Sequence, residues 1–139
     1  HVYVADVRTG RSTRVTRTAL LATLVTSAAW TADGRSLLVV QLPANRGAAP
    51  VRGNSGVADG PQVRLTESAK KPQRVHFSLM EDPHDKALYK YYTTGQLALV
   101  DAATGNTRTI GTPGMIRSVD ASPDARYFRV TRVVEPFSY

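Results

Sequence analysis

The most informative stretch of the sequence reads Ala29-Trp30-Thr31-Ala32-Asp33-Gly34-Arg35, followed by Ser36-Leu37-Leu38-Val39-Val40. An Asp-Gly pair between two apolar runs is a strong signal for a β-hairpin, because glycine accepts the positive φ of a tight turn. The same pattern returns at Asp120-Ala121-Ser122-Pro123-Asp124-Ala125-Arg126, before the apolar run 127–131. The sequence therefore predicts two similar hairpins far apart in the chain.

A second repeated pattern alternates with the first. Val2-Tyr3-Val4-Ala5-Asp6-Val7-Arg8-Thr9-Gly10 matches Leu97-Ala98-Leu99-Val100-Asp101-Ala102-Ala103-Thr104-Gly105. In both, an apolar strand runs into Asp, two linking residues and Thr-Gly. We expect Gly10 and Gly105 to take positive φ, while the Asp and Thr side chains bond local backbone amides.

The alternation of the two patterns predicts an all-β fold. Strands are expected near residues 2–7, 12–16, 26–31, 36–42, 96–101, 107–111, 116–121 and 126–134. Four antiparallel strands repeated around an axis form the blades of a β-propeller. The prediction is a partial β-propeller, with about one complete four-stranded blade and parts of two neighbours. Residues 1–139 then form one domain fragment, in which 1–16 end one blade, 24–111 form the next with an insertion at 43–95, and 115–139 begin a third.

The predicted insertion has two parts. Residues 43–75 contain four Pro and four Gly without periodicity and indicate a surface loop. Asp82 then has the features of a helix N-cap, with Pro83 at the first helical position. The spacing of Ala87, Leu88, Tyr91 and Tyr92 predicts the buried face of a short helix, which Gly95 is expected to end.

Several of these segments resemble one known family. The hairpin motifs at 30–35 and 121–126 resemble the Trp-Ser-Pro-Asp-Gly-Lys/Arg motif of TolB-like and prolyl-oligopeptidase-type propellers. The segment 99–105 resembles the Val-Asp-Leu-x-Thr-Gly motif of the same propellers. The segments 42–48, 67–71, 82–92, 96–101 and 133–139 resemble the propeller of glutamyl-endopeptidase-like members of the prolyl oligopeptidase (S9) family of serine peptidases. Ala32 and Ala125 depart from the usual Pro and Gly, so the turn at Ala125 is expected to differ in type.

The resemblance implies a longer parent protein. In that family a propeller covers a C-terminal α/β-hydrolase domain with a Ser-Asp-His triad, restricts access to the active site and helps to select the peptide substrate. By resemblance the parent favours cleavage after Glu. The alternative is a TolB-like or WD40-like propeller that binds proteins as a scaffold and has no enzyme activity.

This chain carries no recognisable catalytic motif of its own. It has no Gly-x-Ser-x-Gly nucleophile elbow, no phosphate-binding Gly loop and no cysteine. We therefore predict no catalytic residue, cofactor or metal within it, and expect the isolated chain to hydrolyse neither peptides nor esters. No apolar run approaches a membrane span, so no membrane partner is predicted.

The charge is basic, with a formal net value of +7. The cations are spread along the chain, which favours a solvated arginine-rich surface over nucleic-acid binding. Binding of nucleic acid through this surface is a third, weaker hypothesis, and the sequence leaves the cellular compartment open.

Individual polar and aromatic residues each have a functional and an ordinary interpretation. His76, His84 and Asp85 could bind a metal ion or could be ordinary surface residues. Glu81, Asp82 and Asp85 could act as acid–base carboxylates or could cap the helix. Ligand stacking by Trp30 competes with core packing. Each remaining candidate either contacts substrate or has an ordinary role in packing or on the solvated surface. These candidates are Tyr89, Tyr91, Tyr92, Lys70, Lys71, Arg74, Arg117, Arg126, Arg129 and Arg132.

Both ends of the sequence resemble interrupted strands, at 2–6 and 133–139. A run of about two blades would leave strand edges unpaired and apolar faces uncovered. We therefore expect the 139-residue chain to aggregate or to form oligomers when it is produced alone.

Overall fold

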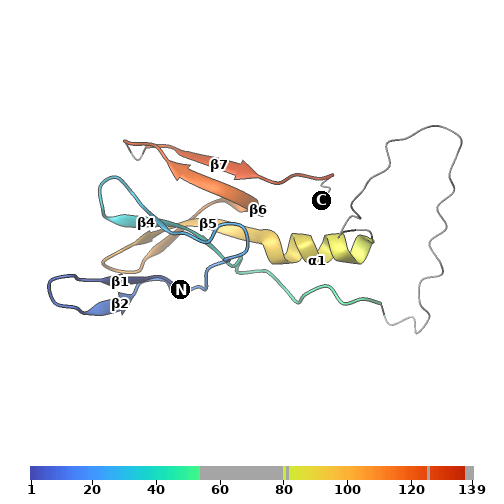
Figure 1. The fold of residues 1–139 in the computed structure, drawn as a ribbon, viewed down its shortest axis with the longest axis horizontal. Helices are drawn as coiled ribbons and strands as arrows, with labels where there is room; N and C mark the ends of the chain where they lie inside the picture. Colours follow the sequence, from blue (N-terminus) through green and yellow to red (C-terminus); the bar gives the residue numbers. More distant parts are fainter. Residues whose placement is uncertain (54–79, 81, 125, 137–139) are drawn as a thin grey trace, which may run out of the picture.

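The structure is a computed structural model that describes residues 1–53, 80, 82–124 and 126–136. Seven strands and one helix follow one another along this part of the chain (Figure 1). The elements are β1 (Tyr3–Ala5), β2 (Ser12–Arg14), β3 (Ala29–Trp30), β4 (Ser36–Gln41), α1 (Pro83–Thr93), β5 (Thr94–Asp101), β6 (Thr107–Ala121) and β7 (Phe128–Arg132). The fold is thus mostly β, with one short helix that continues directly into β5.

The strands pair only with antiparallel neighbours. β1 and β2 form a two-stranded sheet, and the other strands form a five-stranded sheet in the order β3-β4-β5-β6-β7. β4 pairs with β5 from Ser36↔Asp101 to Gln41↔Gln96. The two paired strands are therefore separated in the sequence by residues 42–93. Residues 42–53 contain no helix or strand, as predicted for the start of the loop, whereas 54–75 lie outside the described residues.

The sheet curls because β6 changes its partner along its length. Residues 107–115 of β6 pair with β5, and residues 116–121 pair with β7. The sequence predicts two strands here, at 107–111 and 116–121, and this expectation is wrong because the backbone stays extended between them. Irregular register at Gly95/Leu97 and at Ile116/Ser118 lets the second half of β6 turn away from β5.

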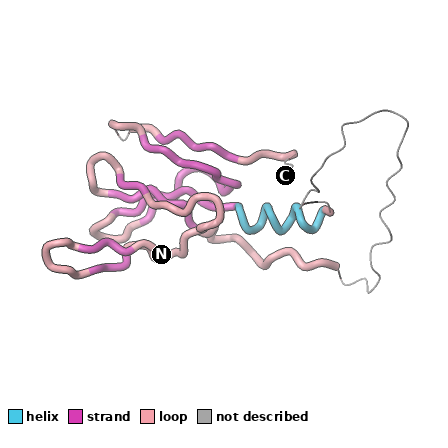
Figure 2. Tube along the Cα trace, viewed as in Figure 1, coloured by secondary structure: helices cyan, strands magenta, loops and turns pink. Residues whose placement is uncertain are grey.

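Three layers result from this topology (Figures 1 and 2). The β1–β2 hairpin lies on one side of β4 and β5, and the β6–β7 hairpin lies on the other. One core cluster joins Val2, Val4 and Val15 to Leu37, Val39, Ala98 and Val100. The other joins Val119, Phe128 and Val130 to Leu38, Val40 and Leu97.

The central strands are buried on both faces, which explains their unbroken apolar sequence. Leu37, Leu38, Val39 and Val40 are each at most 4% exposed, and alternate residues enter opposite clusters because side chains alternate across a strand. Each fully buried side chain of this size contributes roughly 1.5–3 kcal/mol to folding. β4 and β5 therefore form the centre of the structure.

Two hairpins share an Asp-based turn. In the first, Asp6 Oδ1 accepts the backbone N–H of Arg8 at 2.8 Å, and the N–H of Gly10 donates to the carbonyl of Asp6 at 2.8 Å. Asp101 repeats this arrangement with Ala103 and Gly105, at 3.1 and 2.8 Å. Gly10 and Gly105 have φ of 69° and 71°, which confirms the positive φ predicted for them.

The other two hairpins share a second Asp turn. The hydroxyl of Thr31 donates to Asp33 Oδ1 at 2.6 Å, and the backbone N–H of Arg35 donates to the same oxygen at 3.0 Å. Ser122 and Asp124 repeat the hydroxyl contact at 2.5 Å. These hydrogen bonds confirm the two hairpins predicted at Asp33 and Asp124. Ala125, and therefore the type of its turn, lies outside the described residues.

These hydrogen bonds lower the pKa of all four turn carboxyls. The largest cause is the backbone N–H of Arg8 for Asp6, the hydroxyl of Thr31 for Asp33, the hydroxyl of Thr104 for Asp101 and the hydroxyl of Ser122 for Asp124. Donors that point at a carboxylate favour its ionised form. The turns are thus built for charged aspartates.

Candidate functional site

The helix α1 begins as the sequence predicts. Asp82 is the N-cap, and its Oδ1 accepts the backbone N–H of Asp85 at 2.7 Å, with Pro83 at the start of the helix. That bond is the main cause of the lowered pKa of Asp82, and the positive charge of Arg52 adds to it. Arg52 Nη2 lies 2.8 Å from Asp82 Oδ2. This carboxylate therefore caps the helix and binds a loop arginine, as the capping interpretation expects.

The end of α1 differs from the prediction. The helix ends at Thr93, and Thr94 caps it in extended conformation. Gly95 belongs to β5, where a side-chain Cβ would meet Val40 Cγ1, and Leu21 Cδ2 at 2.8 Å. Glycine is required here by close packing of the strand and not by a helix stop, so the expectation that Gly95 ends the helix is wrong.

One arginine fastens α1 to the loop that follows β4. The guanidinium carbon of Arg46 lies 4.1 Å from the centre of the Tyr91 ring, and its Nη2 donates to the carbonyl of Tyr91 at 3.2 Å. The hydroxyl of Tyr91 in turn donates to the carbonyl of Gly47 at 3.1 Å. Stacking of a guanidinium on an aromatic ring combines charge attraction with packing. We call Arg46, Gly47 and Tyr91 the arginine clamp.

A groove runs along the other side of α1. Its helix wall consists of residues spaced by three and four positions, which lie on one face, and its opposite wall is the segment after β7. The groove has a volume of about 610 Å³ and is lined by Pro83, Lys86, Ala87, Lys90, Glu135 and Pro136. We call this feature the α1 groove.

The α1 groove combines an apolar floor with a positive rim. Lys90 Nζ binds Glu135 Oε1 at 2.9 Å and joins the two walls, although both side chains are more than half exposed, so the pair adds little stability. Lys86 is exposed and forms no ion pair with another described residue. Among the described residues that line the groove, Lys86 is therefore a positive charge without an ion-pair partner.

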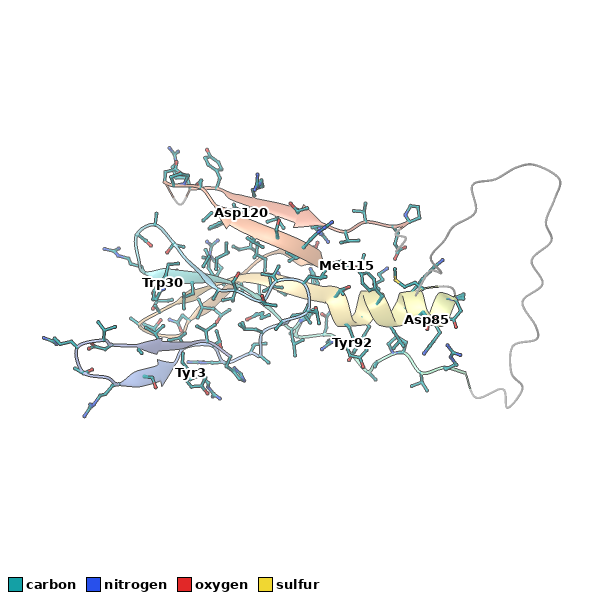
Figure 3. All side chains as sticks on the ribbon, viewed as in Figure 1. Tyr3, Trp30, Asp85, Tyr92, Met115 and Asp120 are labelled. Carbon is teal, nitrogen blue, oxygen red and sulfur yellow. The ribbon has the colours of Figure 1, made fainter. Side chains whose placement is uncertain are left out.

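The predicted site residues are scattered. Asp85 and Tyr92 lie on α1, far from Trp30 at the strand end of the molecule (Figure 3). His84 also lies on α1, but the described residues contain no group of three or more His, Asp or Glu side chains arranged for a metal ion. Five further candidates lie outside the described residues: Lys70, Lys71, Arg74, His76 and Glu81.

Some aromatic candidates pack against other residues, and others are exposed to solvent. Tyr91 is half-buried in the arginine clamp, whereas Tyr92 is 50% exposed, so the predicted buried face of α1 is only partly correct. Trp30 is 49% exposed, and the expectation that it packs in the core is wrong for this structure. Trp30 lies on a face of β3 that the described residues cover only in part, whereas Ala29 on the same strand packs against a core cluster.

The strand arginines lie on the surface. Arg129 binds Asp120 at 2.9 Å, and Arg132 donates to the carbonyl of Pro113 at 3.1 Å. Arg117 and Arg126 are exposed. The sequence reasoning gave no role to Lys86, Lys90 or Glu135, although the four-residue spacing of the two lysines signals a shared helix face.

Comparison with known proteins finds two relatives with the same name. A probable glutamyl endopeptidase of the chloroplast from Oryza sativa subsp. japonica is 31% identical over 99% of this chain, and one from Arabidopsis thaliana is 32% identical over 99%. The chain spans about 15% and 14% of these two relatives. No protein-family profile and no solved structure matches the chain.

These matches relate the chain to a segment of proteins named as peptidases. Its structure is a curled, β-rich unit with one short helix. Within the described residues, no helix has the length and apolar character needed to cross a membrane.

Proposed function

We propose that the chain is part of the β-propeller of a prolyl-oligopeptidase-type serine peptidase, where the propeller gates the active site and helps to select peptides. The observation that carries this proposal is the stacking of hairpins on both faces of β3–β6. A blade of a propeller has a neighbour on each face in this manner. The two relatives named glutamyl endopeptidase support the peptidase part of the proposal.

The proposal divides the residues 1–139 among three blades. The β1–β2 hairpin ends one blade, β3, β4, β5 and the first half of β6 form the second, and the second half of β6 with β7 begins the third. The helix α1 and the arginine clamp belong to the insertion between the second and third strands of the middle blade. The catalytic triad lies in a separate α/β-hydrolase domain of the same polypeptide.

The α1 groove supplies a place for substrate selection under this proposal. Lys86, which has no ion-pair partner among the described residues, attracts acidic peptides, which agrees with cleavage after Glu. Coulomb attraction of this kind is worth little for one exposed charge, but it raises the local concentration of an oppositely charged ligand. Selection therefore acts before the peptide reaches the triad.

The test uses the complete polypeptide encoded by the gene that contains these residues. We expect peptide hydrolysis that is lost when the Ser of its Gly-x-Ser-x-Gly word is replaced by Ala. Lys86→Glu should lower kcat/KM several-fold for acidic peptides. It should leave hydrolysis of a small uncharged ester unchanged, because such an ester is not selected by the α1 groove. Arg8→Glu, at the far end of the molecule, is the matched charge control.

Two results would overturn this function. A complete polypeptide without hydrolase activity would favour the alternative, a TolB-like or WD40-like propeller that binds proteins. Equal effects of Lys86→Glu and Arg8→Glu on acidic peptides would remove the α1 groove from substrate selection.

A further inference from the structure

The charged residues of α1 and its N-cap are divided between two sides of the helix. Asp82 and Asp85 lie toward Arg52, whose Nη2 is 2.8 Å from Asp82 Oδ2 and 3.6 Å from Asp85 Oδ1. Lys86 and Lys90 instead line the α1 groove, whose other wall is the segment after β7. The acidic side chains of the helix are thus held by Arg52, and the two lysines are left for the groove.

One of the two lysines already holds a carboxylate of this chain. Lys90 Nζ lies 2.9 Å from Glu135 Oε1. The side chains of Lys90 and Glu135 are 59% and 57% exposed, so water can solvate both groups when the pair separates. Exposed pairs contribute little to stability, because water weakens the attraction and both side chains lose conformational freedom. Another carboxylate can therefore replace that of Glu135 on Lys90 at small cost.

The two lysines are spaced to receive two carboxylates from one extended chain. Four residues of an α-helix rise about 6 Å, so Lys86 and Lys90 lie one above the other on the same helix face. Alternate residues of an extended peptide lie on one side of the chain and are about 6.6 Å apart. Acidic residues at alternate positions therefore match Lys86 and Lys90 together, whereas a single acidic residue needs only Lys86.

We propose that Glu135 is an internal competitor in the α1 groove, which a peptide with acidic residues at alternate positions must displace from Lys90. Lys86, which has no ion-pair partner among the described residues, makes the first contact. A second carboxylate of the peptide then replaces that of Glu135 on Lys90, and Glu135 returns to water. The inference rests on the proposed role of the α1 groove in substrate selection. It adds that the chain itself weakens the preference for peptides with two acidic residues over peptides with one.

The test measures peptide binding to the complete polypeptide, in which the Ser of the Gly-x-Ser-x-Gly motif is replaced by Ala so that no peptide is cleaved. The probes are Ala-Glu-Ala-Glu-Ala and Ala-Glu-Ala-Gln-Ala, each labelled with a dye of no net charge, and fluorescence anisotropy gives their Kd. Glu135→Gln should lower the Kd of the two-Glu peptide about threefold, the size expected for loss of one exposed competing pair. The Kd of the one-Glu peptide should change much less, because that peptide uses Lys86.

Asp120→Asn is the matched control for this measurement. It removes the same charge from another exposed ion pair, in which Arg129 Nη2 lies 2.9 Å from Asp120 Oδ2. Asp120 lies at the strand end of the molecule, far from Asp85 on α1 (Figure 3). This variant should therefore leave the Kd of both peptides unchanged.

A double variant shows whether the effect of Glu135 passes through Lys90. In the Lys90→Gln background the second carboxylate has no partner, so Glu135→Gln should lose most of its effect on the two-Glu peptide. A gain of the same size in this background would mean that Glu135 acts only as a general repulsive charge, and would overturn the proposal. Equal Kd values of the two-Glu peptide for the Glu135→Gln and Asp120→Asn variants would overturn it as well, and so would a lack of binding to every variant.

The outcome is separable from the function proposed above. If Lys86→Glu lowers kcat/KM for acidic peptides while Glu135→Gln leaves binding unchanged, the α1 groove still selects peptides and the internal competitor is refuted. If Glu135→Gln strengthens binding of the two-Glu peptide to a polypeptide that has no hydrolase activity, the internal competitor remains and the peptidase proposal fails.

Discussion

The two ends of this molecule are organised differently. At one end lie the four hairpin turns, and at the other lies α1 with the arginine clamp (Figure 1). Each turn is closed by bonds between residues at most five positions apart, such as Thr31, Asp33 and Ser36. At the helix end, bonds also join residues that are far apart in the chain, such as Arg46 with Tyr91 and Lys90 with Glu135, each pair 45 positions apart.

The two ends differ in how far their structure follows from neighbours in the sequence. A turn of six residues contains its own donors and acceptors, so its conformation follows from local chemistry. The helix end depends on segments that meet only after the chain has folded. Variants at the two ends should therefore differ in how much stability they lose. They should also differ in whether that loss comes from packing between segments or from local hydrogen bonds.

The largest effect is expected at Gly95, in the strand that leaves α1. Gly95→Ala would press its new methyl group against Val40 and Leu21, and overpacking of a core of this kind costs about 1–3 kcal/mol. Gly53→Ala is the matched control, because among the described residues no atom beyond its chain neighbours lies within 4 Å of the position that a Cβ would take there. Urea unfolding of the complete polypeptide that contains these residues, followed by far-ultraviolet circular dichroism, measures both. Equal stability of the two variants would refute the close approach.

A smaller effect separates two turn glycines that share a positive φ. Gly34 and Gly105 have φ of 66° and 71°, where an L-residue costs about 1–2 kcal/mol. A Cβ at Gly105 also lies 2.9 Å from the carbonyl oxygen of Val15, whereas a Cβ at Gly34 would have no atom within 4 Å. Gly105→Ala should therefore lower the urea midpoint more than Gly34→Ala, and the reverse order would contradict packing of this turn against the segment after β2.

The smallest expected effect is a dependence on pH at the turn end. Because the pKa values of Asp6, Asp33, Asp101 and Asp124 are lowered in the folded state, their contribution is present above the unfolded value near 3.8. It is lost as the pH falls through the lower folded values. Asp33→Asn should flatten the decrease in stability between about pH 5 and pH 2, measured as urea midpoints, and an unchanged slope would argue against the charged turn.

The sequence predicted the hairpins and the start of α1 because both depend on neighbours in the chain. The bonds of Asp33, Asp101 and the N-cap Asp82 agree with those expectations. It did not predict the continuous β6 or the exposure of Trp30. Each depends on which strand lies beside another, and no local pattern contains that information.

The candidate site shows the same limit. Residues 83, 86, 87 and 90 have the spacing of one helix face, so the helix wall of the α1 groove was visible in the sequence. Its other wall, at Glu135 and Pro136, begins 45 residues further along the chain than Lys90. The arginine clamp likewise depends on how the loop at Arg46 returns to Tyr91.

Local sequence specifies the four hairpin turns, the capped helix and the two central strands that are apolar on both faces. These follow from short-range hydrogen bonding and from the alternation of side chains along a strand. Packing between segments decided that β6 runs unbroken from its pairing with β5 to its pairing with β7, that Gly95 has no room for a side chain beside Val40 and Leu21, and that Trp30 is open on one face. The physical reason is that packing depends on distances between segments, which the order of residues does not specify locally.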